Sequence, residues 1–349
     1  MNLFPETICI NGAVHRVETL LEKSSPVCPA GIESDLIEFL AQWYGPQNFI
    51  TVHTSGSTGA PKPIALDKQF VARSAGRTIQ FFGLEPGQRV LLCLPLRYIA
   101  GKLMVIRALL GQLDLCPVDP ASDFSFLAQC RDTPFRFAAM VPNQVSKLLD
   151  DPARFEGLDS LLIGGSALSS RLETRLQNVP TSCFASYGMT ETATHIALRR
   201  INGPEASDGF HCLQGICVGL SETGCLTIDM QGLDRLVTND LAQLDDAKTF
   251  RILGRADHVI ICGGIKYFPE TIEKKLEKAI EQPFFIGSLP DETLGRRMVL
   301  VIEALPDNVL EKRVAQSLAR CLDRYERPRK IVFKKPFERT ETGKIIRTF

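Results

Sequence analysis

The segment HTSGSTGAPKPI, residues 53–64, follows a predicted strand at Phe49–Val52 and precedes a predicted helix at Lys68–Phe82. Between Ser55 and Lys62 it places three hydroxyl side chains, two glycines and one lysine. Glycine lets the backbone approach an oxyanion and turn its N–H groups toward it, while hydroxyls and a lysine add donors and charge. The segment therefore predicts a polyphosphate-binding loop, although its spacing differs from Walker A. A Ser/Gly-rich surface turn is the alternative.

Strand and helix patterns alternate around this loop. Such alternation predicts an α/β fold with mostly parallel sheets flanked by helices. Asn11-Gly12 predicts a hairpin turn, and Ile32–Tyr44 has the spacing of an amphipathic helix. The other expected strands are at 90–94, 113–118, 137–141, 161–163 and 183–185, and the other helices are at 100–110, 144–149 and 170–178.

The pattern changes in the second half of the chain. Strands become shorter after Gly219, and another change in composition follows Arg251–Asp257. We therefore expect a large N-terminal domain, residues 1–255, with a β-rich last part. A small C-terminal α+β domain, residues 256–349, should follow. Its expected elements are helices at 269–279 and 308–320 and strands at 299–302 and 331–333.

The composition argues against a nucleic-acid-binding, membrane-spanning or secreted protein. The 349 residues include 40 basic and 40 acidic side chains without basic runs, so we expect no nucleic-acid surface. Three cations interrupt the most apolar stretch, Val90–Leu110, which argues against a membrane span. The start of the chain has no secretory pattern and the 11 cysteines form no CxxC, so a reduced cytoplasmic protein is expected. A metal site of His211, Cys212, Cys217 and Cys225 is the alternative.

The loop and four later motifs, all in the same order, resemble those of the adenylate-forming superfamily. This superfamily includes acyl-CoA ligases, firefly luciferase and the adenylation domains of peptide synthetases. The resemblance covers the chain from about Phe49 to its end. It implies that ATP phosphates are bound by loop residues Thr54, Ser55, Gly56, Ser57, Thr58, Gly59 and Lys62.

The motif SYGMTET, residues 186–192, is expected where a strand ends and a helix begins. It resembles the superfamily's adenine- and metal-binding segment. The resemblance implies that Tyr187 lies against adenine and that Thr190 and Glu191 act at the phosphates, with Glu191 as a magnesium ligand. A helix cap with an exposed acid is the alternative. His195 is expected on the same helical face, bordering the acyl pocket or serving a structural role. The implied nucleotide contacts also include Ser186, Gly188 and Met189.

Two further motifs imply nucleotide contacts. LLIGGSALS, residues 161–169, resembles the turn that closes over adenine. The segment 238–264 resembles the stretch leading to the domain hinge, although Asn239 replaces the usual glycine. The resemblance implies that Asp240 binds the ribose hydroxyls, that Arg255 reaches the nucleotide and that Asp257 is the hinge residue. Surface charges are the alternative for Asp240 and Arg255. The implied adenine contacts are Gly164, Gly165, Ser166 and Ala167.

The last two motifs lie in the expected C-terminal domain. GGIKYFPETIEKKL, residues 263–276, resembles the segment whose loop enters the active site for thioester formation. That loop would contain Gly263, Gly264 and Ile265. RTETGKIIRTF, residues 339–349, resembles the motif that carries the catalytic lysine, which would be Lys344.

The resemblance implies an ATP-dependent acid–thiol ligase. A small-molecule carboxylic acid and ATP would give an acyl-adenylate and pyrophosphate, with Mg²⁺ as cofactor. Coenzyme A would then give acyl-CoA and AMP. The oligomeric state stays open, with a homodimer as one candidate.

The segment LPLRYIAGKLMVIRALLGQ, residues 94–112, corresponds to part of the substrate pocket in this superfamily. Arg97 and Lys102 in an apolar setting predict a second substrate carboxylate, unless both extend to solvent. With 53 residues before Thr54, a shortened N-terminal part is expected. These features most resemble short o-succinylbenzoate–CoA ligases of menaquinone synthesis. The alternatives are another aryl- or acyl-CoA ligase, an acyl-AMP ligase that loads a carrier protein, and a non-enzymatic binding module.

Overall fold

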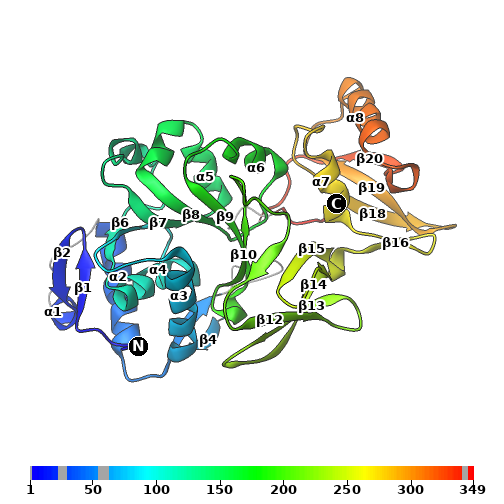
Figure 1. Ribbon diagram of the computed structural model, residues 1–349. Helices are drawn as coiled ribbons and strands as arrows, with labels where there is room; N and C mark the ends of the chain where they lie inside the picture. Colours follow the sequence, from blue (N-terminus) through cyan, green and yellow to red (C-terminus); the bar gives the residue numbers. More distant parts are fainter. Residues whose placement is uncertain (1, 23–29, 54–62, 340–344) are drawn as a thin grey trace. The chain divides into compact units, whose positions relative to one another are not determined.

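The computed structural model describes residues 2–22, 30–53, 63–339 and 345–349 (Figure 1). The chain forms two compact units. Unit 1 comprises Met1–Leu168, Arg175–Ile216 and Gln231–Leu233, and unit 2 comprises Ser169–Thr174, Cys217–Met230 and Asp234–Phe349. The predicted boundary between residues 255 and 256 lies inside unit 2 and stays a prediction.

The sheet of unit 1 has the strand order β11-β10-β9-β8-β7-β5-β6-β1-β2. Neighbouring strands from β9 to β6 pair in parallel, and β1 also joins β6 in parallel. The other pairs are antiparallel. The strands are β1 (Thr7–Ile10), β2 (Ala13–Arg16), β5 (Arg89–Leu92), β6 (Asp114–Pro117), β7 (Phe135–Met140), β8 (Leu158–Ile163), β9 (Ser182–Gly188), β10 (His195–Arg200) and β11 (Phe210–Cys212).

Helices α3 and α4 cover one face of this sheet and α5 covers the other (Figure 1). This arrangement confirms the α/β class predicted from the alternating pattern. A separate antiparallel pair, β3 and β4, leads into α3. The bounds are α1 (Val17–Glu22), α2 (Ala30–Tyr44), β3 (Phe49–His53), β4 (Pro63–Asp67), α3 (Lys68–Phe82), α4 (Ile99–Gly111), η1 (Ser125–Gln129), α5 (Pro142–Leu148), η2 (Pro152–Gly157), α6 (Ser170–Leu176) and η3 (Thr190–Thr192).

Local chemistry explains where several elements begin and end. The Asp67 side chain accepts a hydrogen bond from Phe70 N at 2.9 Å and caps α3, which Gly83 ends at φ 55°. Asn11 and Gly12 turn the first hairpin with φ values of 51° and 79°, as an Asn-Gly turn of the I′ type requires. Both elements therefore follow the sequence prediction.

Unit 2 contains one antiparallel region and one small α+β layer. Strands β12 to β15 are neighbours in sequence order, while β18, β19 and β20 form a second sheet whose buried face packs on α7 and α8. Strand β18 was not among the predicted elements. The bounds are β12 (Ile216–Leu220), β13 (Cys225–Met230), β14 (Leu233–Leu244), β15 (Thr249–Arg255), η4 (Ala256–His258), β16 (Ile260–Cys262), β17 (Ile265–Tyr267), α7 (Pro269–Leu276), β18 (Phe284–Asp291), β19 (Gly295–Ile302), α8 (Asn308–Cys321), η5 (Arg324–Glu326) and β20 (Lys330–Phe333).

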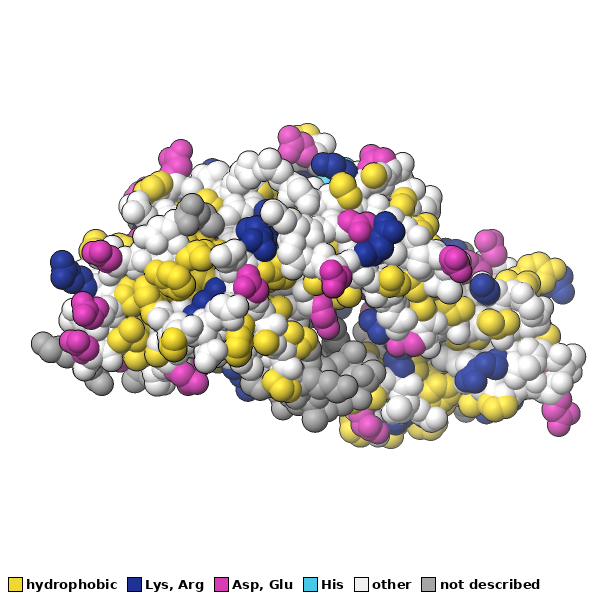
Figure 2. Space-filling view, turned by 90° about the horizontal axis from the view of Figure 1, so that it is seen from below, with side chains coloured by type: hydrophobic (Ala, Val, Ile, Leu, Met, Phe, Trp, Pro, Cys, Tyr) yellow, Lys and Arg dark blue, Asp and Glu magenta, His cyan; other side chains and the backbone are white. Residues whose placement is uncertain are grey.

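The surface bears charges of both signs. On the face shown in Figure 2, basic and acidic side chains are interspersed rather than gathered by sign. Across the described residues, no helix combines the length and the apolar character that crossing a membrane requires.

Helix α4 approaches the loop before it very closely at Gly101. A Cβ atom there would lie 2.4 Å from the carbonyl oxygen of Pro95, which is backbone and cannot move aside cheaply. We expect Gly101→Ala to lower the free energy of unfolding by about 1–3 kcal/mol, as overpacking does. Urea titration would measure the change.

Gly111 is the matched control because it lies in the same helix. A Cβ there would meet only side chains of Leu113 and Ile79, at 3.0–3.3 Å. Gly111→Ala should change the free energy of unfolding by less than about 1 kcal/mol, since alanine also favours the helix. Equal losses in the two variants would contradict the importance of the Gly101 contact.

Candidate active site

The predicted phosphate loop and the predicted catalytic lysine are not placed. Residues 54–62 and 340–344 lie outside the described residues. The assignments of Thr54 to Lys62 and of Lys344 therefore stay predictions. The remaining predicted residues divide between unit 1 and unit 2.

In unit 1, two predicted adenine-binding segments meet at the carboxyl ends of β8 and β9. The Ser186 hydroxyl donates to Ile163 O at 3.1 Å, and Gly164 N donates to Met140 O at 3.0 Å. A Cβ atom on Gly164 would lie 2.4 Å from Ser186 Oγ, so glycine allows this approach without a shift of the Ser186 side chain. The next residue, Gly165, has φ 85°. The structure therefore brings the segments 164–167 and 186–189 together at the sheet edge where α/β proteins commonly bind ligands.

Thr190 and Glu191 begin the short η3 turn that follows β9. The Glu191 side chain is exposed, and among the described residues it has no ion pair or hydrogen bond. A free carboxylate at this edge has the chemistry of a magnesium ligand. The described residues contain no group of three His, Cys, Asp or Glu side chains that could hold a metal ion by themselves. The alternative metal site around Cys212 therefore has no support.

The predicted helix after SYGMTET is wrong, and with it the helical placement of His195. Ala193 has φ 61° and ends η3 after one turn, so the chain reverses. His195 then begins β10 and pairs with Gly188 of β9. The close approach of Gly188, whose added Cβ would lie 2.2 Å from Thr194 O, supports this hairpin. Sequence periodicity could not distinguish a helix from a tight hairpin in so short a segment.

His195 is 4% exposed and lies between two threonine hydroxyls. Its Nε2 is 3.3 Å from Thr78 Oγ1, and its Nδ1 is 3.4 Å from Thr194 Oγ1. Burial lowers the pKa of His195 well below its ordinary value, and the charges of Arg107 and Arg77 lower this pKa further. The imidazole is therefore neutral at pH 7.

The predicted substrate cations have different surroundings. Arg97 is exposed, with its guanidinium 4.8 Å from the centre of the Tyr98 ring. Lys102 is partly buried and donates to Gln42 Oε1 at 3.0 Å and to Thr51 O at 3.1 Å. The burial on which the prediction relied therefore does not hold for Arg97, and Lys102 has partners within the chain. Their role in substrate binding stays a prediction.

Arg107 is the buried cation that the sequence analysis missed. Its side chain is 1% exposed, and burial lowers its pKa to about 9. Its Nη1 contacts the sulfur of Met104 at 3.2 Å, its guanidinium lies 5.7 Å from the centre of the Phe137 ring, and its Nε has no partner. Within the described residues no carboxylate pairs with it. The long apolar run of α4 was the available signal, because it made Arg107 an expensive residue at that position.

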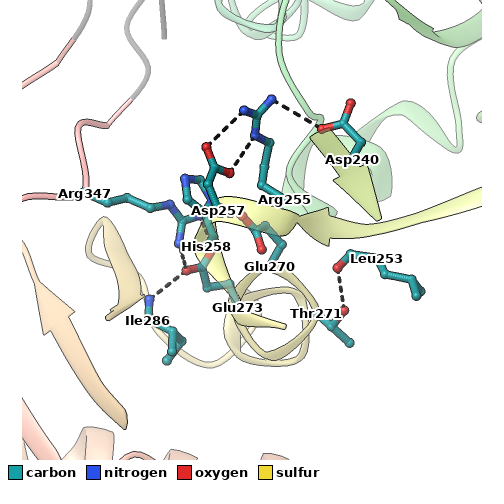
Figure 3. Close-up of polar contacts among 10 residues, drawn as sticks. All are labelled: Asp240, Leu253, Arg255, Asp257, His258, Glu270, Thr271, Glu273, Ile286 and Arg347. Carbon is teal, nitrogen blue, oxygen red and sulfur yellow. Dashed lines mark hydrogen bonds and ion pairs between the residues drawn. The ribbon is translucent and has the colours of Figure 1, made fainter. Parts of the chain in front are cut away.

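Unit 2 contains the predicted ribose and hinge residues in one connected group (Figure 3). Arg255 makes two hydrogen bonds to Asp257, at 3.1 and 3.2 Å, and its Nη1 lies 3.5 Å from Asp240 Oδ1. The hydrogen bond to Asp257 is the main cause of the raised pKa of Arg255. Asp240, within β14, is the register partner of Arg255, the last residue of β15, and their roles at the nucleotide stay predictions. The predicted thioester loop is the turn between β16 and β17, where Gly264 has φ 82° and open space around its Cα.

Comparison with known proteins identifies the family of this chain. The family model described as AMP-binding enzyme matches residues 40–213. A solved structure from Dyadobacter fermentans, described as an acyl-CoA synthetase (AMP-forming)/AMP-acid ligase II-like protein, is 34% identical. The match covers 94% of this chain and 96% of that one, with a TM-score of 0.62.

Two further relatives are more distant. The 2-succinylbenzoate–CoA ligase of Lactococcus lactis is 20% identical over 93% of this chain and 74% of its own length. The o-succinylbenzoate CoA synthetase of Bacillus subtilis, solved with an acyl-adenylate intermediate, is 20% identical with a TM-score of 0.72. That match covers 85% of this chain and 67% of the synthetase, which has also been solved with ATP and a magnesium ion. On this evidence the chain belongs to the AMP-binding enzyme family of the adenylate-forming superfamily.

Proposed function

We propose that this protein is an acid–thiol ligase that activates o-succinylbenzoate, an acid of menaquinone synthesis. In the first half-reaction a carboxylate oxygen attacks the α-phosphorus of ATP, and pyrophosphate leaves. In the second, the sulfur of coenzyme A attacks the acyl carbon, and AMP leaves. The family and the names of the relatives from Lactococcus lactis and Bacillus subtilis support the proposal.

The chain offers donors for both negatively charged reactants. A carboxylate and a triphosphate repel each other, so the site must supply fixed positive charge where they meet. The loop 54–62, Lys344 and a magnesium ion on Glu191 would do this. Asp240 and Arg255 would bind the ribose, and Tyr187 would lie against adenine. The Lactococcus relative supports the proposed reaction by its name, and the Bacillus synthetase supports it by its name and by the acyl-adenylate, ATP and magnesium ion with which it was solved.

The burial of the Arg107 guanidinium without a carboxylate partner among the described residues is the observation that favours o-succinylbenzoate as the acid. A buried guanidinium without a carboxylate is costly, because burial removes the water that would otherwise solvate the charge. The missing anion can come from a substrate with two carboxylates, one activated and one left free. Arg107 also lies close enough to His195 for its charge to affect that residue's pKa, and His195 pairs directly with Gly188 of the SYGMT segment. We therefore assign the free carboxylate of o-succinylbenzoate to Arg107.

The hydrogen bonds around His195 define which nitrogen carries its proton. Thr78 Oγ1 donates its one proton to Ser74 O at 3.3 Å, so it must accept from His195 Nε2. Nδ1 is then the acceptor and faces Thr194. The imidazole of His195 is neutral and cannot pair with a carboxylate as a cation. Among the described residues around His195, Arg107 is therefore the one buried cation available to a carboxylate.

An exchange assay against a panel of acids tests the proposed function. The purified protein with ATP, Mg²⁺ and radiolabelled pyrophosphate should form labelled ATP with o-succinylbenzoate, and with benzoate or fatty acids far more slowly. Addition of coenzyme A should yield the thioester. Exchange without thioester would indicate an acyl-AMP ligase that loads a carrier protein. The absence of exchange with every acid would reject the enzyme and favour a binding module.

The variant Arg107→Met tests the proposed carboxylate contact. We expect the KM for o-succinylbenzoate to rise about tenfold or more, because a charged hydrogen bond is worth about 1.5–3 kcal/mol. The KM for ATP should stay within about twofold of the wild-type value. Methionine keeps an apolar environment intact, so the fold should persist.

Arg97→Met is the matched control for this measurement. Arg97 is exposed, so its loss should leave the KM for o-succinylbenzoate unchanged. If the free carboxylate instead bound Arg97, as the sequence alone suggested, the KM for o-succinylbenzoate would rise more in Arg97→Met than in Arg107→Met. A larger effect at Arg97 would therefore move the carboxylate site away from Arg107.

His195 should make stability depend on pH. Its folded pKa lies below the unfolded value of about 6.5, so the unfolded state binds the proton first as pH falls. The contribution of His195 is therefore complete above about pH 6.5 and is lost below it, by up to about 1.4 kcal/mol per pH unit. We expect His195→Gln to flatten the decline in unfolding free energy between pH 7.5 and 5.5. Replacing the exposed His211 should leave the decline as in the wild type; indistinguishable slopes for wild type and His195→Gln would contradict the burial argument.

A further inference from the structure

A cavity lies at the amino ends of the parallel strands in unit 1, and we call it the amino-edge cavity. Its volume is about 420 Å³, and it is open to solvent. Its wall includes the first residues of β5, β6 and β7, which are Arg89, Asp114 and Phe135. The segments 164–167 and 186–189 gather at the carboxyl ends of β8 and β9, on the opposite edge of the same sheet. The cavity is therefore separate from the candidate adenine-binding segments.

Two opposite charges line this cavity side by side. Arg89 and Asp114 are register partners in the parallel pair of β5 and β6, so their side chains leave the same face of the sheet. Among the described residues no ion pair joins them, and neither side chain pairs with another group of opposite charge. Each charge therefore faces the cavity without a counter-charge from the chain.

The Asp114 carboxylate is nearly buried, at 8% exposure. Its Oδ1 accepts from Gly12 N at 2.8 Å, and its Oδ2 is 3.8 Å from the thiol of Cys116, a weak donor. Burial, and secondarily the charge of Asp114, raise the pKa of the Cys116 thiol to about 11, so this thiol is uncharged at pH 7. A carboxylate with so little exposure is costly without a cation. A bound ammonium group would supply that cation.

The Arg89 guanidinium is held in one position by its neighbours. Its Nη1 donates to Thr133 O at 2.7 Å and to Thr133 Oγ1 at 3.3 Å. Its Cζ lies 4.1 Å from the centre of the Phe135 ring, which is a cation–π distance. Because these contacts engage one nitrogen and one face of the group, the Nε and Nη2 donors stay available to a carboxylate.

An apolar wall accompanies the two charges. The ring of Phe126 in η1 lies 6.1 Å from that of Phe135, at 82° to it, and Val118 lines the cavity as well. Ligand sites commonly have volumes of about 300–1,000 Å³ and combine such apolar walls with a few polar groups that orient the ligand. The amino-edge cavity has this size and this composition.

We propose that the amino-edge cavity binds an α-amino acid with an apolar side chain. Its ammonium group would pair with Asp114, and its carboxylate would pair with Arg89. Its side chain would lie against Phe126 and Phe135. A singly charged ligand would leave one of the two protein charges unpaired, so a zwitterion is favoured. The adjacent charges of an α-amino acid also match side chains on strands about 4.8 Å apart. Such binding requires neither ATP nor an acid substrate, so it is independent of the proposed function.

Calorimetric titration of the purified protein with three matched ligands tests the proposed site. L-phenylalanine carries both charges, phenethylamine carries the ammonium group alone, and 3-phenylpropanoate carries the carboxylate alone. We expect L-phenylalanine to bind with a Kd below about 1 mM. Each analogue should bind about tenfold or more weakly, because it forms one charged contact in place of two.

Two variants of the cavity should weaken the binding of L-phenylalanine. Asp114→Asn keeps an oxygen that can accept from Gly12 N, so the fold should persist. Asp114→Asn and Arg89→Met should each raise the Kd about tenfold or more, since each removes one charged partner. Arg136→Met is the matched control, because Arg136 follows Phe135 on β7 but pairs with Asp159 outside the cavity. Its Kd should stay within about twofold of the wild-type value, as expected for a surface pair.

Three results would overturn the proposal. Neither L-phenylalanine nor L-leucine giving a binding signal at about 10 mM would show that the cavity takes no such ligand. Equal affinities for the zwitterion and its two analogues would show that the paired charges have no part in binding. An unchanged Kd in both cavity variants would place the bound amino acid elsewhere. If Arg89→Met does not fold, the Kd of Asp114→Asn and the order of the three ligands decide.

Discussion

The contact on which the site in unit 1 depends is the approach of Gly164 to the Ser186 hydroxyl at the carboxyl ends of β8 and β9. A side chain at Gly164 would force the Ser186 hydroxyl to move, because an added Cβ would lie 2.4 Å from Ser186 Oγ. Because β7, β8 and β9 are parallel neighbours, their carboxyl ends share one edge, and the segments that follow them must gather there. The hairpin from β9 to β10 then returns His195 beneath the same edge. The positions of Gly164, Ser186 and His195 follow from that register.

Charge burial distinguishes Arg107 from the other cations of its region. Lys102 satisfies its ammonium group with an amide and a carbonyl oxygen, and Arg97 keeps its guanidinium at the surface. Arg107 is buried, its Nε has no hydrogen-bond partner among the described residues, and its neighbour His195 is neutral. A protein that retains such a residue in an apolar helix gains little stability from it. In the proposed function, the free carboxylate of the substrate would supply the missing partner of this charge.

The sequence predicted elements whose signals are local. The helix at 68–82, with Asp67 before it and Gly83 after it, and the Asn11-Gly12 hairpin are examples. The sequence could not predict what depends on contacts across the chain. The turn at Ala193 replaced an expected helix, and the exposure of Arg97 and the burial of Arg107, ten residues apart in one segment, could not be distinguished from composition. Motif order placed Asp240, Arg255 and Asp257, but only the structure shows that their side chains contact one another.

The candidate residues of unit 1 and those of unit 2 are organised by different physical means. In unit 1 the geometry comes from backbone packing at a parallel sheet edge, where glycine and short side chains permit close approach. In unit 2 it comes from charged side chains that run from Asp240 to Arg347. The largely buried pair of Arg347 and Glu273 costs desolvation energy, so it is better explained by directional constraint than by stability. Each unit thereby fixes its own groups before any substrate binds, and such preorganisation lowers the entropy lost when the reacting groups are brought together.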